Sequence, residues 1–201
     1  MKTDTERTER QKAEEKKIRR VPEFARDESG KYIYVGGYRS LSIGEEEYRK
    51  TVIFSLLLLL PALALTVLTG CISGTGIDDA GGILVFYVIG LVLLIMTAFA
   101  LLGMLRHGRR MKNYDYKTTA GRLPFLAFGL AVCGAGGLVA IGIRLARGLF
   151  VARPTGAAVL IASFAAQTVA GVLTRRKMER WSWEEEKGLY EMEAEENDHE
   201  A

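Results

Sequence analysis

The chain has 201 residues, and 25% of them are charged, a fraction close to that of an ordinary soluble protein. The charges are crowded into residues 1–50, 106–122 and 175–201, however, and the stretches between these segments contain few. This separation excludes a single soluble core and predicts an integral membrane protein. The net charge of +3 also hides an asymmetry, because residues 184–201 are strongly acidic and the remainder is basic.

The N-terminal fifty residues divide into two parts. Residues 1–21 are rich in Lys, Arg and Glu and lack an apolar core, so we expect a disordered or solvated tail and no cleavable signal peptide. Residues 22–48 are predicted to form a small cytoplasmic module. Within it, the β-forming residues 31–35 lie between two turn signals, 28–30 and 36–37, a pattern that favours a β-hairpin.

The first long helix is expected to begin at the end of this module. Ser42-Ile43-Gly44-Glu45 matches a capping box, in which the serine and glutamate side chains each bond an unpaired backbone N–H. Pro61 falls inside the following apolar stretch, where it removes one helix hydrogen bond and predicts a kink.

Four stretches are long and apolar enough to cross a membrane, which takes about 20 helical residues. They are residues 51–71, 83–105, 123–143 and 155–173, and together they predict a four-helix transmembrane region over residues 49–174. The fourth is the shortest and is rich in alanine. Pro154 suits its start, and the charged run 175–177 suits its end. The predicted fold is therefore an all-α integral membrane protein, a four-transmembrane-helix bundle with an acidic C-terminal tail over residues 175–201.

The positive-inside rule gives an orientation. Lys and Arg are plentiful before the first stretch, in the second connection and after the fourth stretch, whereas the first connection has none and contains Asp78 and Asp79. We therefore predict a multi-pass protein of the plasma membrane with both termini in the cytoplasm. Arg144, Arg147 and Arg153 in the third connection oppose this orientation but are outnumbered.

Small residues recur every four positions along the last two stretches. Such ridges let helix backbones approach closely, so they predict a tight hairpin of the third and fourth helices. Two alternatives are a self-association face and the general abundance of small residues in membrane helices. The predicted helix-packing residues are Gly129, Cys133, Gly137, Ala158, Ala162, Ala166 and Ala170.

Several charged or polar residues are candidates for binding sites. The basic connection could contact anionic lipid through Arg106, Arg109, Arg110 and Lys112, although as a topology signal it needs no further role. Arg144, Arg147 and Arg153 could line an anion pocket, but arginines at helix ends commonly extend to the interface. Asp78 and Asp79 lack the further oxygen ligands that a hard cation needs. We expect Gln167 to hydrogen-bond a neighbouring helix in preference to a transported solute.

The C-terminal segment begins with Trp181 and Trp183, aromatic residues that favour the headgroup level. Ser182-Trp183-Glu184-Glu185 matches a second capping box and predicts a short acidic helix over residues 184–195. This helix is either a solvated tail or an interaction arm that meets the basic connection or a partner. Leu68-Thr69-Gly70-Cys71 resembles a bacterial lipobox, but it follows too many residues, so we expect an ordinary helix end.

No catalytic motif stands out. His107 and His199 are the only histidines, and no HExxH, GxSxG or phosphate-loop pattern occurs, so no enzyme activity, cofactor, metal site or nucleic-acid partner is predicted. The leading hypothesis is a non-enzymatic accessory or scaffold component of a membrane complex, in contact with the lipid bilayer and with other membrane subunits or further copies of itself. A small transporter or channel subunit is the alternative, and a lipid-acting membrane enzyme is the third.

Overall fold

The computed structural model describes residues 24–26, 32–75, 77, 81–150 and 152–186. Within these residues, four helices are long and apolar enough to span a membrane, which confirms the four predicted stretches. These helices are α2 (Glu45–Cys71), α3 (Gly81–His107), α5 (Leu123–Ala146) and α6 (Pro154–Met178). Pro154 opens α6 as predicted, because its missing N–H would be unpaired there anyway.

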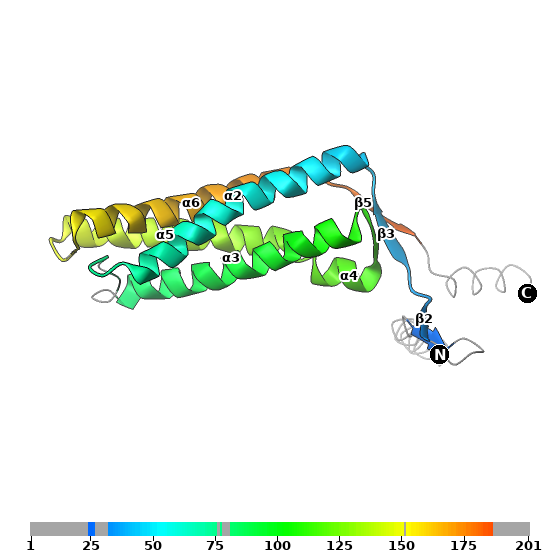
Figure 1. The fold of residues 1–201 in the computed structure, drawn as a ribbon, viewed down its shortest axis with the longest axis horizontal. Coiled ribbons are helices and arrows are strands. Elements are labelled where there is room, and N and C mark those ends of the chain that lie inside the picture. Colours follow the sequence, from blue (N-terminus) through cyan, green and yellow to red (C-terminus); the bar gives the residue numbers. More distant parts are fainter. Residues whose placement is uncertain (1–23, 27–31, 76, 78–80, 151, 187–201) are drawn as a thin grey trace, which may run out of the picture.

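The helices lie side by side along most of their length (Figure 1). They follow one another in the ring α2–α6–α5–α3, so that the last helix closes the bundle against the first. Large apolar side chains such as Phe99, 70% exposed, and Phe125, 75% exposed, cover the outside of this ring. Such an apolar surface is suited to contact with lipid chains and is unfavourable in water.

The interior of the bundle contains three clusters of buried apolar residues. One lies at the end where α2 begins and includes Tyr48, Met104, Leu123 and Met178. A second lies in the middle, and a third lies at the opposite end around Phe164. The first cluster also takes in residues from strands outside the four helices.

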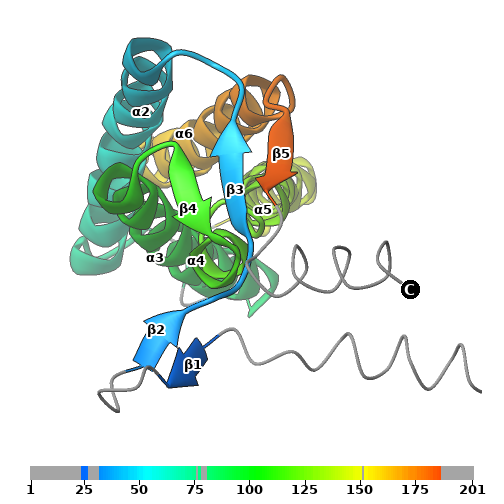
Figure 2. The ribbon, with the colours of Figure 1, turned by 90° about the vertical axis from the view of Figure 1, so that its right-hand side faces the viewer.

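These additional residues belong to a small antiparallel sheet that caps one end of the bundle (Figure 2). The central strand is β3 (Tyr38–Leu41), with β4 (Arg110–Lys112) on one side and β5 (Trp183–Glu186) on the other. Leu41 of β3 and Met111 of β4 point into the first buried cluster. The sheet thus joins the segment before α2, the connection after α3 and the segment after α6.

The all-α prediction is therefore incomplete, because the fold is mostly helical with strands at one end. A separate pair of strands, β1 (Phe24–Arg26) and β2 (Tyr32–Tyr34), is also antiparallel. The short helix α4 (Asn113–Thr118) lies in the same connection as β4. This connection is thus folded, with two elements of its own.

Both predicted capping boxes are wrong. Helix α2 does begin at Glu45, but its N-cap residue is Gly44, and no side chain caps it. Ser42 instead donates from its hydroxyl to the backbone oxygen of Ser182, because β3 brings the two segments together. The acidic helix expected from Glu184 is also wrong at its start, since residues 183–186 form β5; the rest of that prediction lies outside the described residues.

Candidate functional site at the sheet-capped end

Opposite charges on different strands of the sheet form two ion pairs, one between neighbouring strands and one across the central strand. In β5, Glu185 pairs with Arg39 of β3 at 2.9 Å, and Glu186 pairs with Arg110 of β4 at 2.6 Å. The antiparallel register sets Arg39 opposite Glu185, so the first pair follows directly from strand pairing. The acidic C-terminal segment therefore meets the chain's own basic connection, one of the two arrangements that the sequence left open.

The four basic residues predicted to contact lipid lie at this end, in different surroundings. Arg106 is exposed in the last turn of α3. Arg109 donates to the backbone oxygen of Ile43, Arg110 pairs with Glu186, and the Lys112 ammonium lies 5.1 Å from the centre of the Tyr34 ring. Three of these side chains therefore contact the protein itself.

Tyr48 connects three parts of the chain beneath the sheet. Its side chain is 1% exposed, and its hydroxyl donates to the backbone oxygen of Met104 near the end of α3 at 2.8 Å. Its ring also lies 5.5 Å from that of Trp181, just after α6. A buried tyrosine needs a partner for its hydroxyl, so this bond fixes the start of α2 against the end of α3.

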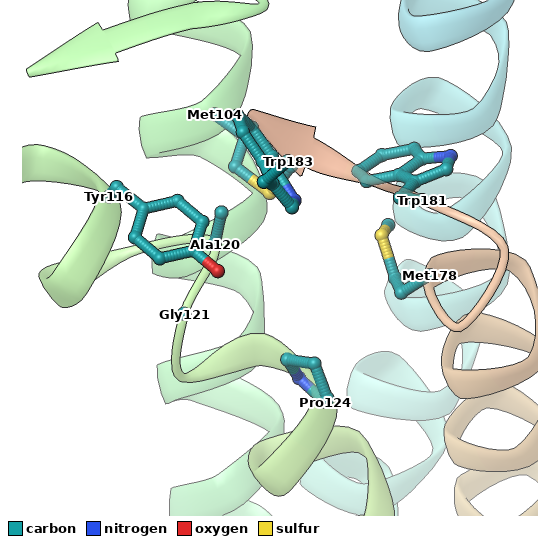
Figure 3. A pocket seen from close by; sticks show the side chains of 8 residues that line it. All are labelled: Met104, Tyr116, Ala120, Gly121, Pro124, Met178, Trp181 and Trp183. Carbon is teal, nitrogen blue, oxygen red and sulfur yellow. The ribbon is translucent and has the colours of Figure 1, made fainter. Parts of the chain in front are cut away.

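A cavity of about 160 Å³ lies beside this contact, between the sheet and the helix ends (Figure 3). Its lining combines three aromatic residues, two methionines and a short turn before α5: Met104, Tyr116, Ala120, Gly121, Pro124, Met178, Trp181 and Trp183. The Tyr116 ring contacts the Trp183 ring edge-on at 5.0 Å, and the Arg39 guanidinium lies 4.5 Å from its centre. These contacts hold Tyr116 in place.

A polar network lies deeper in the bundle. Gln167 of α6 donates to the Thr66 hydroxyl of α2 at 2.9 Å, and that hydroxyl lies 2.9 Å from the hydroxyl of Ser163. Tyr87 of α3 donates to the backbone oxygen of Thr66. The prediction that Gln167 bonds a neighbouring helix is confirmed. The side-chain oxygen of Gln167 is packed against Gly90 of α3. A residue larger than glycine at position 90 would therefore require the Gln167 side chain to move.

The closest helix approach joins α5 and α6, and it uses glycines that the ridge prediction did not include. A Cβ atom on Gly171 of α6 would lie 2.6 Å from the Ala127 oxygen of α5, and one on Gly134 of α5 would lie 2.7 Å from the Phe164 oxygen of α6. Backbone atoms cannot yield as side chains do. These two glycines are therefore required for the observed spacing.

The structure places the seven predicted packing residues in different settings. Gly137 faces the Phe164 ring of α6, whereas Gly129 faces Leu93 of α3. Cys133 and Ala170 are buried, and Ala166 packs against the central cluster. Ala158 and Ala162 are exposed.

The opposite end of the bundle offers fewer convergent groups. Arg144 donates to the backbone oxygen of Leu149, and the Arg153 side chain lies over Gly74 of the connection between α2 and α3. Cys71 is an exposed free thiol at the end of α2. Asp78 and Asp79 lie outside the described residues. Among the residues that the structure describes, no group of three His, Cys, Asp or Glu side chains could hold a metal ion.

Sequence reasoning missed the cavity and the sheet that roofs it. The available signal was the basic-aromatic composition of the second connection together with Trp181 and Trp183, but nothing local indicated that these segments meet. The four apolar helices define the class, a chain with four candidate membrane-spanning helices. Comparison with known proteins goes no further, since no family model, curated protein or solved structure matches the chain.

Proposed function

We propose that this chain is a non-enzymatic accessory or scaffold component of a membrane complex, with several spans in the plasma membrane. The observation that carries the proposal is the sheet that ties three distant segments to one end of the helix bundle. A scaffold needs a fixed membrane body and an accessible surface for another subunit. The ion pairs across the sheet and the buried Tyr48 contact support the fixed membrane body.

The outer side of β5 supports the second requirement. In the described part of the chain, β5 pairs with β3 on one side and is an edge strand on the other. An edge strand presents unpaired N–H and C=O groups that can pair with an extended segment of another chain. Glu184 is exposed on this strand, so a partner segment with basic residues suits it best.

The proposed orientation places the sheet-capped end, and with it both termini, in the cytoplasm. Its support is the unequal distribution of Lys and Arg at the helix ends. At the opposite end the described cations are Arg144, Arg147 and Arg153, whereas the sheet-capped end has Arg49, Lys50, Arg106, Arg109, Arg110, Lys112, Lys117, Arg122, Arg175, Arg176, Lys177 and Arg180.

The two other functional hypotheses gain less from the structure. The transporter or channel alternative is motivated by the four spans, the proline within α2 and Gln167, and the Gln167 side chain is fully buried and donates to Thr66 between helices. A lipid-acting enzyme needs acid–base groups at the interface. No histidine or carboxylate is among the residues that line the cavity.

Site-specific photocrosslinking tests the scaffold proposal. A photoreactive phenylalanine analogue replaces Glu184 on the edge of β5, and a matched variant carries it at Val139, which is 61% exposed on the apolar surface of α5. After irradiation of intact cells, we expect one reproducible protein adduct from position 184 that is absent from position 139. Adducts that are equal at the two positions, or none at position 184, would contradict the proposal.

A further inference from the structure

The cavity at the sheet-capped end has a buried floor and an accessible mouth. Met104, Ala120 and Met178 are buried, whereas Gly121 and Pro124 are exposed where α5 begins. Gly121 and Pro124 therefore mark the mouth at the start of α5, and Figure 3 shows Met178 and Trp181 across the cavity from Tyr116. A cavity of about 150 Å³ accepts a ligand of roughly benzene size, so this one can hold a group of several heavy atoms.

The mouth lies where apolar helix gives way to charge. Arg175, Arg176 and Lys177 occupy the last turn of α6, and Arg122 immediately precedes α5. Tyrosine and tryptophan side chains have an apolar ring and a polar group at its edge, so they favour the headgroup level of a bilayer. The cavity is thus positioned to receive the headgroup of a lipid, not the interior of its acyl chains.

Two neutral donors point into the cavity. Figure 3 shows the Tyr116 hydroxyl and the Trp183 indole turned towards the space above Pro124. Within the described part of the chain, neither group donates a hydrogen bond to the protein. Both groups donate well to the oxygen atoms of a phosphate ester. A purely apolar ligand would leave them without a partner.

Two cations lie near the mouth. Arg122 and Arg180 each adjoin a residue that lines the cavity, and both are exposed, whereas the Lys177 ammonium lies 5.8 Å from the centre of the Phe54 ring of α2. Each such cation near the membrane surface raises the affinity for an anionic headgroup about fivefold. This charge favours an anionic ligand over a zwitterionic one.

We propose that this cavity binds the phosphate-ester headgroup of an anionic phospholipid. Tyr116 and Trp183 donate to its oxygen atoms, and Arg122 and Arg180 neutralise its charge. The site differs from the lipid contacts predicted from the sequence, because Arg109, Arg110 and Lys112 contact the protein itself. The inference requires a membrane location but does not rest on the scaffold role.

The two tryptophans of the chain, Trp181 and Trp183, both line the cavity, so intrinsic fluorescence reports directly on its occupancy. The full chain is placed in phosphatidylcholine nanodiscs with increasing phosphatidylglycerol, and retained lipid is counted by native mass spectrometry. We expect a saturable change in the emission spectrum and a retained phosphatidylglycerol molecule. In a parallel experiment, glycerol phosphate is added as a soluble ligand to the chain in phosphatidylcholine nanodiscs. Saturation in that experiment would assign the cavity to a free phosphate ester and overturn the lipid proposal.

Variants separate specific binding from general surface attraction. Tyr116→Phe keeps the ring and the charge but removes one donor, and it should weaken the response to phosphatidylglycerol about tenfold, the value of one hydrogen bond to a charged group. The double variant Arg122→Gln/Arg180→Gln should weaken it about 25-fold. The matched control Arg144→Gln/Arg147→Gln, at the opposite end, should leave it unchanged.

General attraction by the basic surface would follow charge but ignore the Tyr116 hydroxyl. Equal responses of the original chain and Tyr116→Phe, or equal retention of zwitterionic and anionic lipid, would therefore overturn the proposal. Thermal unfolding of each variant in phosphatidylcholine nanodiscs shows whether it is folded. A Tyr116→Phe variant that unfolds at the original temperature and still loses the response supports the site.

Discussion

Gly171 lies where α6 approaches the backbone of α5, and its replacement by alanine tests whether this contact determines the stability of the bundle. A Cβ at position 171 would lie 2.6 Å from the Ala127 oxygen and 2.7 Å from the Ala131 nitrogen. Ordinary contacts begin about 0.7 Å farther apart, so the two helices must separate locally. Overpacking of this kind costs about 1 to 3 kcal/mol.

Gly142→Ala is the matched control, because a Cβ there meets no atom within 4 Å. The intrinsic gain from alanine in a helix, up to about 1 kcal/mol, applies to both variants, so their difference isolates the steric effect. Thermal unfolding in detergent, followed by tryptophan fluorescence, should give Gly171→Ala a melting temperature about 2 to 12 °C below that of Gly142→Ala. Equal melting temperatures would refute the assigned α5–α6 contact.

Three further predictions concern other contacts. Gly90→Ala would bring a Cβ to 2.5 Å from the Gln167 side-chain oxygen and should lower the unfolding free energy by about 1 kcal/mol. In a double-mutant cycle followed by thermal unfolding, most of this loss should disappear when Gly90→Ala is made in a Gln167→Ala background. Tyr48→Phe removes the hydroxyl that bonds the Met104 oxygen and should lower the unfolding free energy by about 1 to 2 kcal/mol in the same assay. In a chain whose own cysteines are replaced by serine, Lys112→Cys should resist an impermeant thiol reagent added to intact cells while Arg147→Cys reacts; the reverse pattern would overturn the cytoplasmic orientation.

The four long helices were predictable because their signal is local. Each apolar stretch is bounded by charge, and the energetic demand to satisfy backbone groups in lipid leaves the helix as the only local solution. The observed helices extend beyond the apolar stretches, as α3 does from the predicted residues 83–105 to Gly81–His107. Charged residues at an interface can continue a helix, so hydropathy sets the apolar part of a span and not its ends.

The direction of helix packing was less predictable from the pattern of small residues. Residues four apart are separated by about 40° around a helix, so the ridge from Ala158 to Ala170 turns through about 120°. One straight helix cannot present all of it to the same neighbour. This is why Ala170 is buried while Ala158 and Ala162 are exposed. Gly134 and Gly171, which make the closest approach, are not on the predicted ridges.

The sheet was unpredictable for a different reason. Its strands are three or four residues long, and β5 reads Trp-Glu-Glu-Glu, a sequence with low β propensity that also resembles a helix start. Its stability comes from pairing with β3 and from ion pairs to Arg39 and Arg110, contacts between segments far apart in the sequence. Local patterns contain no information about such partners.

The sheet also changes how the basic connection should be interpreted. A single basic run in the sequence divides into two groups in the fold. Arg110 is paired with Glu186 within the sheet, whereas Arg122 is exposed at the mouth of the cavity. A paired cation attracts little additional anion, because its partner already supplies the negative charge. In the proposed site, an anionic lipid would meet Arg122 on the cavity side, where Tyr116 and Trp183 can recognise it by hydrogen bonding as well as by charge.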